Sequence, residues 1–175
     1  MKNNDWLKEY EVFLNSESSD VPKAVTETVF ARMKNLLAPS PWFVFLKILG
    51  IHAVVGSLSL SMCHQFGMNP FNTDASLSDW MMSMGGHHVC MIGCGIFFVG
   101  STFALAGYFL SIEEVRVLRK TEFLQTSALG LFSLGLFSFF GAEIALSIAG
   151  LWLLGAFIGS FIATEAAWKF KRTHA

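Results

Sequence analysis

Four apolar stretches of this chain are each long enough to cross a lipid bilayer as a helix. Crossing about 30 Å of hydrocarbon takes roughly 20 helical residues. The expected spans are residues 41–63, 87–110, 124–142 and 144–167. The sequence therefore predicts an all-α fold, an integral membrane four-helix bundle that occupies residues 41–168.

The composition agrees with lipid as the main solvent. Of the 175 residues, 53% are hydrophobic and only 14% are charged, whereas about a quarter of the residues of a soluble domain are charged. A net charge of −1 and the lack of a long basic run argue against a nucleic-acid binder. We therefore expect membrane lipid as a partner and no direct contact with nucleic acid.

The basic residues predict which way the spans face. All twelve Lys and Arg lie within residues 2–47, 116–120 or 169–172, which four spans would place on one side of the membrane. The positive-inside rule makes that side cytoplasmic, so we expect a multi-pass protein of the bacterial inner (plasma) membrane with both termini in the cytoplasm. The expected segments outside the spans are a cytoplasmic tail (1–40), an extracytoplasmic loop (64–86), a cytoplasmic loop (111–123) and a cytoplasmic C-terminus (169–175). Within the loop 111–123 we expect a short helix that begins with a capping box of Ser111 and Glu114.

The tail has the pattern of two short amphipathic helices. Apolar side chains recur at helical spacing after Asp5 and again after Asp20. The residues expected to contact a partner lie on these two faces: Trp6, Tyr10, Phe13, Val25, Val29, Phe30 and Met33. Three fates stay open for these helices: they lie on the inner leaflet or under the bundle, they bind a cytosolic protein as helices in a groove, or they are partly disordered.

Soft and imidazole ligands gather in and beside the expected extracytoplasmic loop. All three cysteines, three of the five histidines and six of the eight methionines lie between Met62 and Cys94. The candidate metal or redox residues are Cys63, His64, His87, His88, Cys90 and Cys94, with Met91 as a possible addition. Thiolate, thioether and imidazole ligands suit Cu(I) or zinc, whereas calcium needs more carboxylates than this loop offers.

Helical spacing predicts part of the geometry of this cluster. His87, Cys90, Met91 and Cys94 recur at i, i+3, i+4 and i+7, so they share one face of a helix. A disulfide between spans, from Cys63 to Cys90 or Cys94, is the alternative to a metal. It is favoured over a Cys90–Cys94 bridge, because an i, i+4 separation lies near the upper limit of disulfide geometry. Plain packing of the thiols is the third interpretation.

Three further polar residues fall within or beside the spans. His52 lies near the middle of the first span, where ionisable groups are costly and are functional candidates. A neutral imidazole hydrogen-bonded to a Ser or a carbonyl is the favoured interpretation. Glu143 is expected to cap the fourth span or to join the cysteine cluster as a ligand. Glu165 is expected to pair with Lys169, four residues further on.

Small residues repeat along two of the spans. Gly93, Gly100 and Gly107 recur every seven residues in the second span, and Gly155 and Gly159 form a small-xxx-small pair in the fourth. Such residues let helix backbones approach closely in a membrane. The close approach is expected either within the bundle or in a homo-oligomer.

The arrangement of segments resembles that of small membrane-bound anti-sigma factors, in which a short amphipathic tail precedes a polytopic bundle. The resemblance implies that the tail contacts a sigma factor and that the outer cluster is the sensor. The zinc-binding signature His-x-x-x-Cys-x-x-Cys of such proteins is absent from the tail, which has no Cys or His. We therefore expect a non-enzymatic regulatory or sensory protein.

Two other classes of protein stay open. One is a membrane thiol oxidoreductase, similar to the bacterial disulfide-bond-forming quinone reductases, although the three cysteines here lack their Cys-x-x-Cys pair. The other is an accessory subunit of a larger membrane complex. A phosphate-binding Gly-Lys loop and a nucleophile elbow are both missing from the sequence, so phosphoryl transfer and hydrolase chemistry are not indicated.

Overall fold

The structure is a computed structural model that describes residues 5–15, 23–37, 39–66, 71–72, 77–142 and 144–174. The chain divides into two compact units, residues 1–34 and residues 35–175. The helices in the described ranges are α1 (Asp5–Asn15), α2 (Lys23–Leu37), α3 (Pro41–Met62), α4 (Leu77–Phe109), α5 (Ile112–Phe139) and α6 (Leu146–His174).

The first unit holds α1 and most of α2, and their apolar side chains are exposed. In α1 these are Tyr10, Val12 and Phe13. In α2 the exposed apolar side chains are Val25, Val29, Phe30 and Met33. The side chain of Trp6 and the residue Asp20 lie outside the described part of the chain. The two helices expected in the tail are therefore present, and the apolar residues described on them are exposed.

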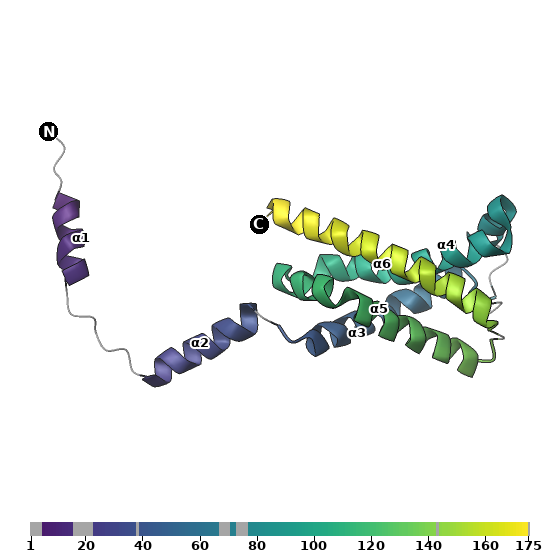
Figure 1. Cartoon of the computed structure of the whole chain (residues 1–175), viewed down its shortest axis with the longest axis horizontal. Coiled ribbons are helices and arrows are strands. Elements are labelled where there is room, and N and C mark those ends of the chain that lie inside the picture. The colour runs from purple at the N-terminus through teal and green to yellow at the C-terminus, as the bar shows by residue number, and fades with distance from the viewer. Residues whose placement is uncertain are drawn as a thin grey trace. The chain divides into compact units, whose positions relative to one another are not determined.

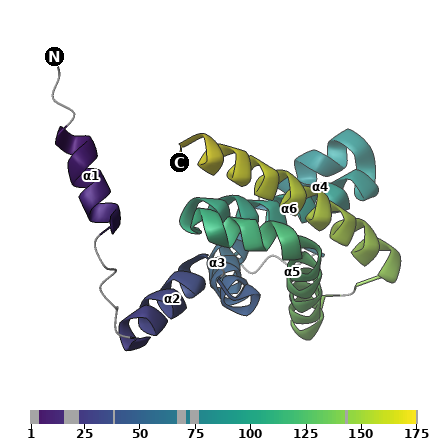
Figure 2. The same ribbon diagram turned by 60° about the vertical axis from the view of Figure 1, so that its left-hand side comes forward.

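The second unit contains α3 to α6, which run alternately in opposite directions (Figure 1). The tightest packing joins α4 to α6, followed by α5 to α6 and α3 to α4. In the view of Figure 2, α6 lies across α4 and α5. Within the described ranges, three helices (α3, α4 and α6) are long and apolar enough to cross a membrane.

The third expected span does not appear as a separate membrane-length apolar helix. It forms the C-terminal part of α5, which begins at Ile112, so the short helix expected within residues 111–123 is continuous with this span. The helix starts there because Ser111 and Glu114 form a reciprocal capping box. Val115 and Leu118 are fully buried, and their packing continues the helix into the apolar stretch.

The expected extracytoplasmic loop is also partly helical. α4 begins at Leu77 and bends sharply at Gly86, whose φ of 70° and ψ of −168° are accessible to glycine at little cost. The short segment before the bend folds back on the long one, and Met81 packs against Gly93. The bend lies at the same end of the bundle as the turn between α5 and α6 (Figure 1).

The small-residue stripes pack α4 against α6 within one chain. A Cβ atom on Gly155 would lie 2.1 Å from the Ile92 carbonyl oxygen, and one on Gly100 would lie 3.2 Å from the Gly159 backbone. These separations leave no room for a side chain between the two helices. The stripes therefore serve the bundle itself, which was one of the two expected roles.

Candidate functional site: a buried thiol cluster beside a membrane cavity

The three cysteines come together at one end of the bundle. Cys63 caps α3 directly after its last residue, and Cys90 and Cys94 lie one helical turn apart on α4. The Cys63 and Cys94 sulfur atoms are 2.7 Å apart, and those of Cys90 and Cys94 are 3.9 Å apart. All three are free thiols with at most 1% of their surface exposed. The structure thus brings together the two cysteines of one of the favoured pairings.

Neighbouring elements hold these thiols in place. Gln65, two residues after Cys63, is buried, and its side-chain oxygen accepts a 2.7 Å hydrogen bond from the Trp152 indole of α6. This bond anchors the chain directly after α3. On the other side, the Cys90 thiol donates to the Ser78 carbonyl at 3.5 Å, so the folded-back start of α4 covers the cluster.

The histidines do not share the burial of the thiols. His87 and His88 follow the bend at Gly86 and are exposed, and His64 is half-buried. Met91 is buried in the same core as the cysteines. Glu143 lies outside the described residues. His87, Cys90 and Cys94 are expected on one helix face, but the structure exposes the imidazole and buries the two thiols.

Within the described ranges, no group of three or more His, Cys, Asp or Glu side chains is arranged to hold a metal ion. Thiolates that share a tetrahedral zinc ion at about 2.3 Å lie about 3.8 Å from each other. The Cys63–Cys94 distance of 2.7 Å is much shorter than this. It lies closer to the disulfide bond length of about 2.05 Å, so the pair is better suited to forming a disulfide than to sharing a metal.

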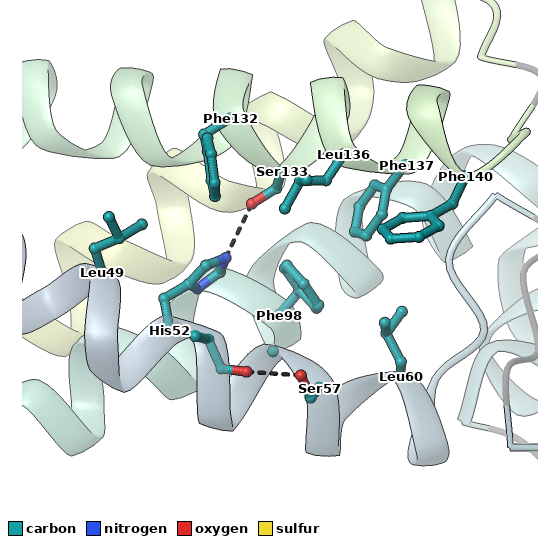
Figure 3. Close-up of a pocket in the computed structure, with 12 residues that line it drawn as sticks. Leu49, His52, Ser57, Leu60, Phe98, Phe132, Ser133, Leu136, Phe137 and Phe140 are labelled. Carbon is teal, nitrogen blue, oxygen red and sulfur yellow. Dashed lines mark hydrogen bonds between the residues drawn. The ribbon is translucent and has the colours of Figure 1, made fainter.

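A cavity of about 740 Å³ opens between α3 and α5 (Figure 3). Most of its lining is apolar, and four phenylalanines contribute to it. The lining residues are Leu49, His52, Ala53, Gly56, Ser57, Leu60, Phe98, Phe132, Ser133, Leu136, Phe137 and Phe140. This volume is typical of a ligand-binding cavity, and the few polar groups on its wall are also typical.

His52 joins three helices at the part of this cavity that lies farther from the thiols. Its Nδ1 atom lies 2.8 Å from the Thr102 hydroxyl of α4. Its Nε2 atom lies 2.9 Å from the Ser133 hydroxyl of α5, the contact drawn in Figure 3. Each hydroxyl has a single proton and can alternatively donate it to a carbonyl of its own helix. A neutral imidazole donates from one nitrogen and accepts at the other, so both nitrogens are satisfied. This arrangement matches the favoured interpretation of His52, with two hydroxyl partners.

An aromatic cluster connects the cavity to the thiols. Phe98 lies one helical turn beyond Cys94, and its ring contacts those of Phe137 and Trp152 at centroid distances of 5.4 and 5.8 Å. Phe66 contacts the Phe137 ring at 5.7 Å. Phe98 and Phe137 also line the cavity. The aromatic cluster thus lines the cavity and lies within about one helical turn of Cys94.

Ion pairs and aromatic stacking organise the opposite end of the bundle. Lys47 of α3 pairs with Glu114 of α5, and Arg119 of α5 pairs with Glu165 of α6. The Arg119 guanidinium also lies over the Trp168 ring at 5.7 Å. The expected pairing of Glu165 with Lys169 is therefore replaced by one between helices, because α5 extends far enough to bring Arg119 opposite Glu165.

Two carboxyl groups at this end have shifted pKa values. Burial alone would raise the pKa of Glu114, but its bonds to Lys47 and Ser111 outweigh burial and hold the pKa below its ordinary value. Burial raises the pKa of Glu122, and the nearby Thr164 hydroxyl opposes this only in part. Glu114 is therefore stabilised as an anion, whereas the surroundings of Glu122 favour its neutral form.

The sequence contained some signals for the features that were not predicted. Ala53 and Gly56 are small residues on the same helix stripe as His52, a pattern that allows a hollow beside the imidazole. The partners of His52 are Thr102 and Ser133, polar residues within apolar stretches that could have been predicted as its hydrogen-bond partners. Gln65 carries no comparable signal, because its burial depends on the position of Trp152.

Comparisons with protein-family models, curated proteins and solved structures found no match to this chain. The resemblance to anti-sigma factors therefore rests on the order of its segments alone. What the fold defines directly is a helical protein with three candidate membrane-spanning helices.

Proposed function

We propose that this chain is a four-span protein of the bacterial inner membrane that senses redox state through Cys63 and Cys94. The single observation that carries the redox proposal is the 2.7 Å distance between these two sulfur atoms. Oxidation would join them, with the loss of two electrons and two protons to an acceptor. A disulfide would then tie the end of α3 to α4.

Burial supports α5 as the fourth span. Its polar residues Gln125, Thr126 and Ser133 are buried and face other helices. Its exposed side chains over the same length include Leu124, Leu131, Phe132, Leu136 and Phe139. The modest overall apolarity of α5 thus comes from inward-facing groups, and the surface left for lipid is apolar, as a membrane helix requires.

The charge distribution supports a cytoplasmic location for one end of the bundle. Lys47 lies near the start of α3, residues 116–120 lie near the start of α5, and residues 169–172 lie near the end of α6. Alternating helix directions bring these segments to the same end. The positive-inside rule makes that end cytoplasmic, which puts the thiol cluster near the outer surface, where disulfides persist.

A disulfide at the end of α3 would act on the rest of the chain through α3 itself. The other end of α3 is tied to α5 by the Lys47–Glu114 pair. A signal needs two arrangements of the helices that differ in free energy between the dithiol and disulfide states. Sliding or tilting of α3, which leads back along the chain to the tail, is the simplest such change.

The redox proposal is tested by counting free thiols in the purified full-length protein before and after treatment with diamide. We expect three free thiols after reduction and one after oxidation, with a Cys63–Cys94 linkage in the peptide map. Cys90→Ser should still form this linkage, and Cys94→Ser should not. Retention of all three thiols after diamide would refute the proposal, and tight binding of copper or zinc by the reduced protein would favour a metal sensor.

The exposed apolar face of the tail supports a partner-binding role. Val29 and Phe30 of α2 are at least half exposed, and clustered exposed apolar groups often mark a binding surface. Full-length protein in nanodiscs should capture one cytosolic protein, as a sigma-factor-like partner would require. Phe30→Asp should abolish this capture. If the wild-type protein recovers nothing beyond what empty nanodiscs recover, the tail lies on lipid instead.

A further inference from the structure

The thiol pair is closed to bulky oxidants that approach from water. Cys63 and Cys94 are fully buried, and Cys90 is 1% exposed. The folded-back start of α4 covers them on one side through Ser78, and Gln65 with Trp152 covers them on another. A bulky water-soluble disulfide has to bring its sulfur into line with an attacking thiolate, and this geometry leaves no path for it.

The cavity between α3 and α5 offers a route from the lipid instead. Its lining runs along α3 from Leu49 to Leu60, a length of about 16 Å at 1.5 Å per residue. Leu60 is three residues before Cys63, and Phe98 is four residues after Cys94. The outer end of the cavity is therefore about one helical turn, roughly 5 Å, from the sulfur pair.

The two ends of the cavity have different chemistry. The outer end carries Phe137 and Phe140, and Phe98 lies between them and His52, so these rings suit a flat ring (Figure 3). Towards the inner end the wall is formed by Leu49, Ala53 and the single ring of Phe132 (Figure 3). The polar atoms of His52 and Ser133 are hydrogen-bonded to each other, so this stretch suits a hydrocarbon chain.

We propose that this cavity binds a lipophilic quinone, with its ring at the outer end and its isoprenoid tail along α3, and that the quinone oxidises Cys63 and Cys94. This inference rests on the proposed redox function. In the reaction the two S–H bonds break and one S–S bond forms. The two electrons and two protons pass to the quinone, whose carbonyl oxygens become the hydroxyls of the hydroquinone.

The test uses full-length, pre-reduced protein in nanodiscs with decylubiquinone as the probe. Loss of thiols and formation of hydroquinone are followed together, and diamide is the oxidant in a parallel reaction. Ala53→Phe places a ring in the cavity. Val54→Phe is the matched control, because Val54 is the next residue of α3, does not line the cavity and is 63% exposed.

We expect one hydroquinone per disulfide in the wild-type protein. Ala53→Phe should slow this reaction at least tenfold, Val54→Phe should leave it within twofold, and diamide should oxidise all three proteins alike. Failure of the quinone to oxidise the wild type, or equal slowing by both variants, would overturn the cavity proposal while leaving the redox proposal intact. Failure of diamide to form the disulfide would remove both.

Discussion

The contact between α4 and α6 makes a quantitative prediction about Gly155. A Cβ atom at this position would lie 2.1 Å from the Ile92 carbonyl oxygen, and ordinary contact begins at 3.4 Å. The backbone of α4 cannot rotate away as a side chain can, so in Gly155→Ala the two helices must separate locally by about 1.3 Å. A gap of 0.5–1 Å already forfeits about a quarter to a half of each van der Waals contact. We expect this variant to lose about 2–3 kcal/mol of unfolding free energy.

The matched control for this prediction is Gly150→Ala. Gly150 lies on the same helix, and a methyl group added there would have no atom within 4 Å. This substitution should be neutral or stabilising by up to about 1 kcal/mol, since alanine favours the helix. Reversible unfolding of the full-length protein in mixed micelles with increasing SDS gives both free energies. Equal stability of the two variants would refute the close packing of α4 and α6 at Gly155.

Three further substitutions test polar residues of the bundle by the same unfolding assay. His52→Leu should cost about 1 kcal/mol or less, because both hydroxyl partners can return to carbonyls of their own helices; a loss above about 3 kcal/mol would contradict this. Glu122→Gln should stabilise the protein at neutral pH, and the gain should shrink as the pH falls, because burial raises the pKa of Glu122 and the folded state favours its neutral form. Glu114→Gln should lower the unfolding free energy at neutral pH, and this loss should vanish as the pH falls through the lowered pKa of Glu114. In a Lys47→Met background the same substitution should cost less, because the ion pair is already absent.

The membrane helices and the amphipathic tail could be predicted because each signal is local. The spans α3 and α6 begin and end within a few residues of the expected bounds, except that α6 continues into the basic C-terminal segment. A long run of apolar residues predicts a membrane-spanning helix from its own length and composition, whatever it packs against. The capping box of Ser111 and Glu114 was equally legible and is confirmed, since its two partners are three residues apart.

The bounds of α5 and the bend in α4 show where local signals were insufficient. The charged segment after Ser111 is expected to form a short helix of its own between spans, yet it is continuous with the next expected span in α5, where Leu118 is buried against the rest of the bundle. The bend at Gly86 depends on a backbone conformation that the sequence permits without requiring it. In both places the packing partner lies far along the chain.

For the site itself, composition indicated a cluster of thiols near one end of the first two spans. The axial position of α3 relative to α4 decides which thiols meet, and that position depends on α6. Trp152 anchors Gln65 directly after Cys63, and its carbonyl seats against Gly95 directly after Cys94. One residue of a third helix thus positions both sulfur atoms. The cavity beside them likewise exists only because small residues of α3 face α5. Long-range packing of this kind leaves no periodic pattern in the sequence. It is this packing that selects the Cys63–Cys94 pair over the alternative Cys63–Cys90 pair.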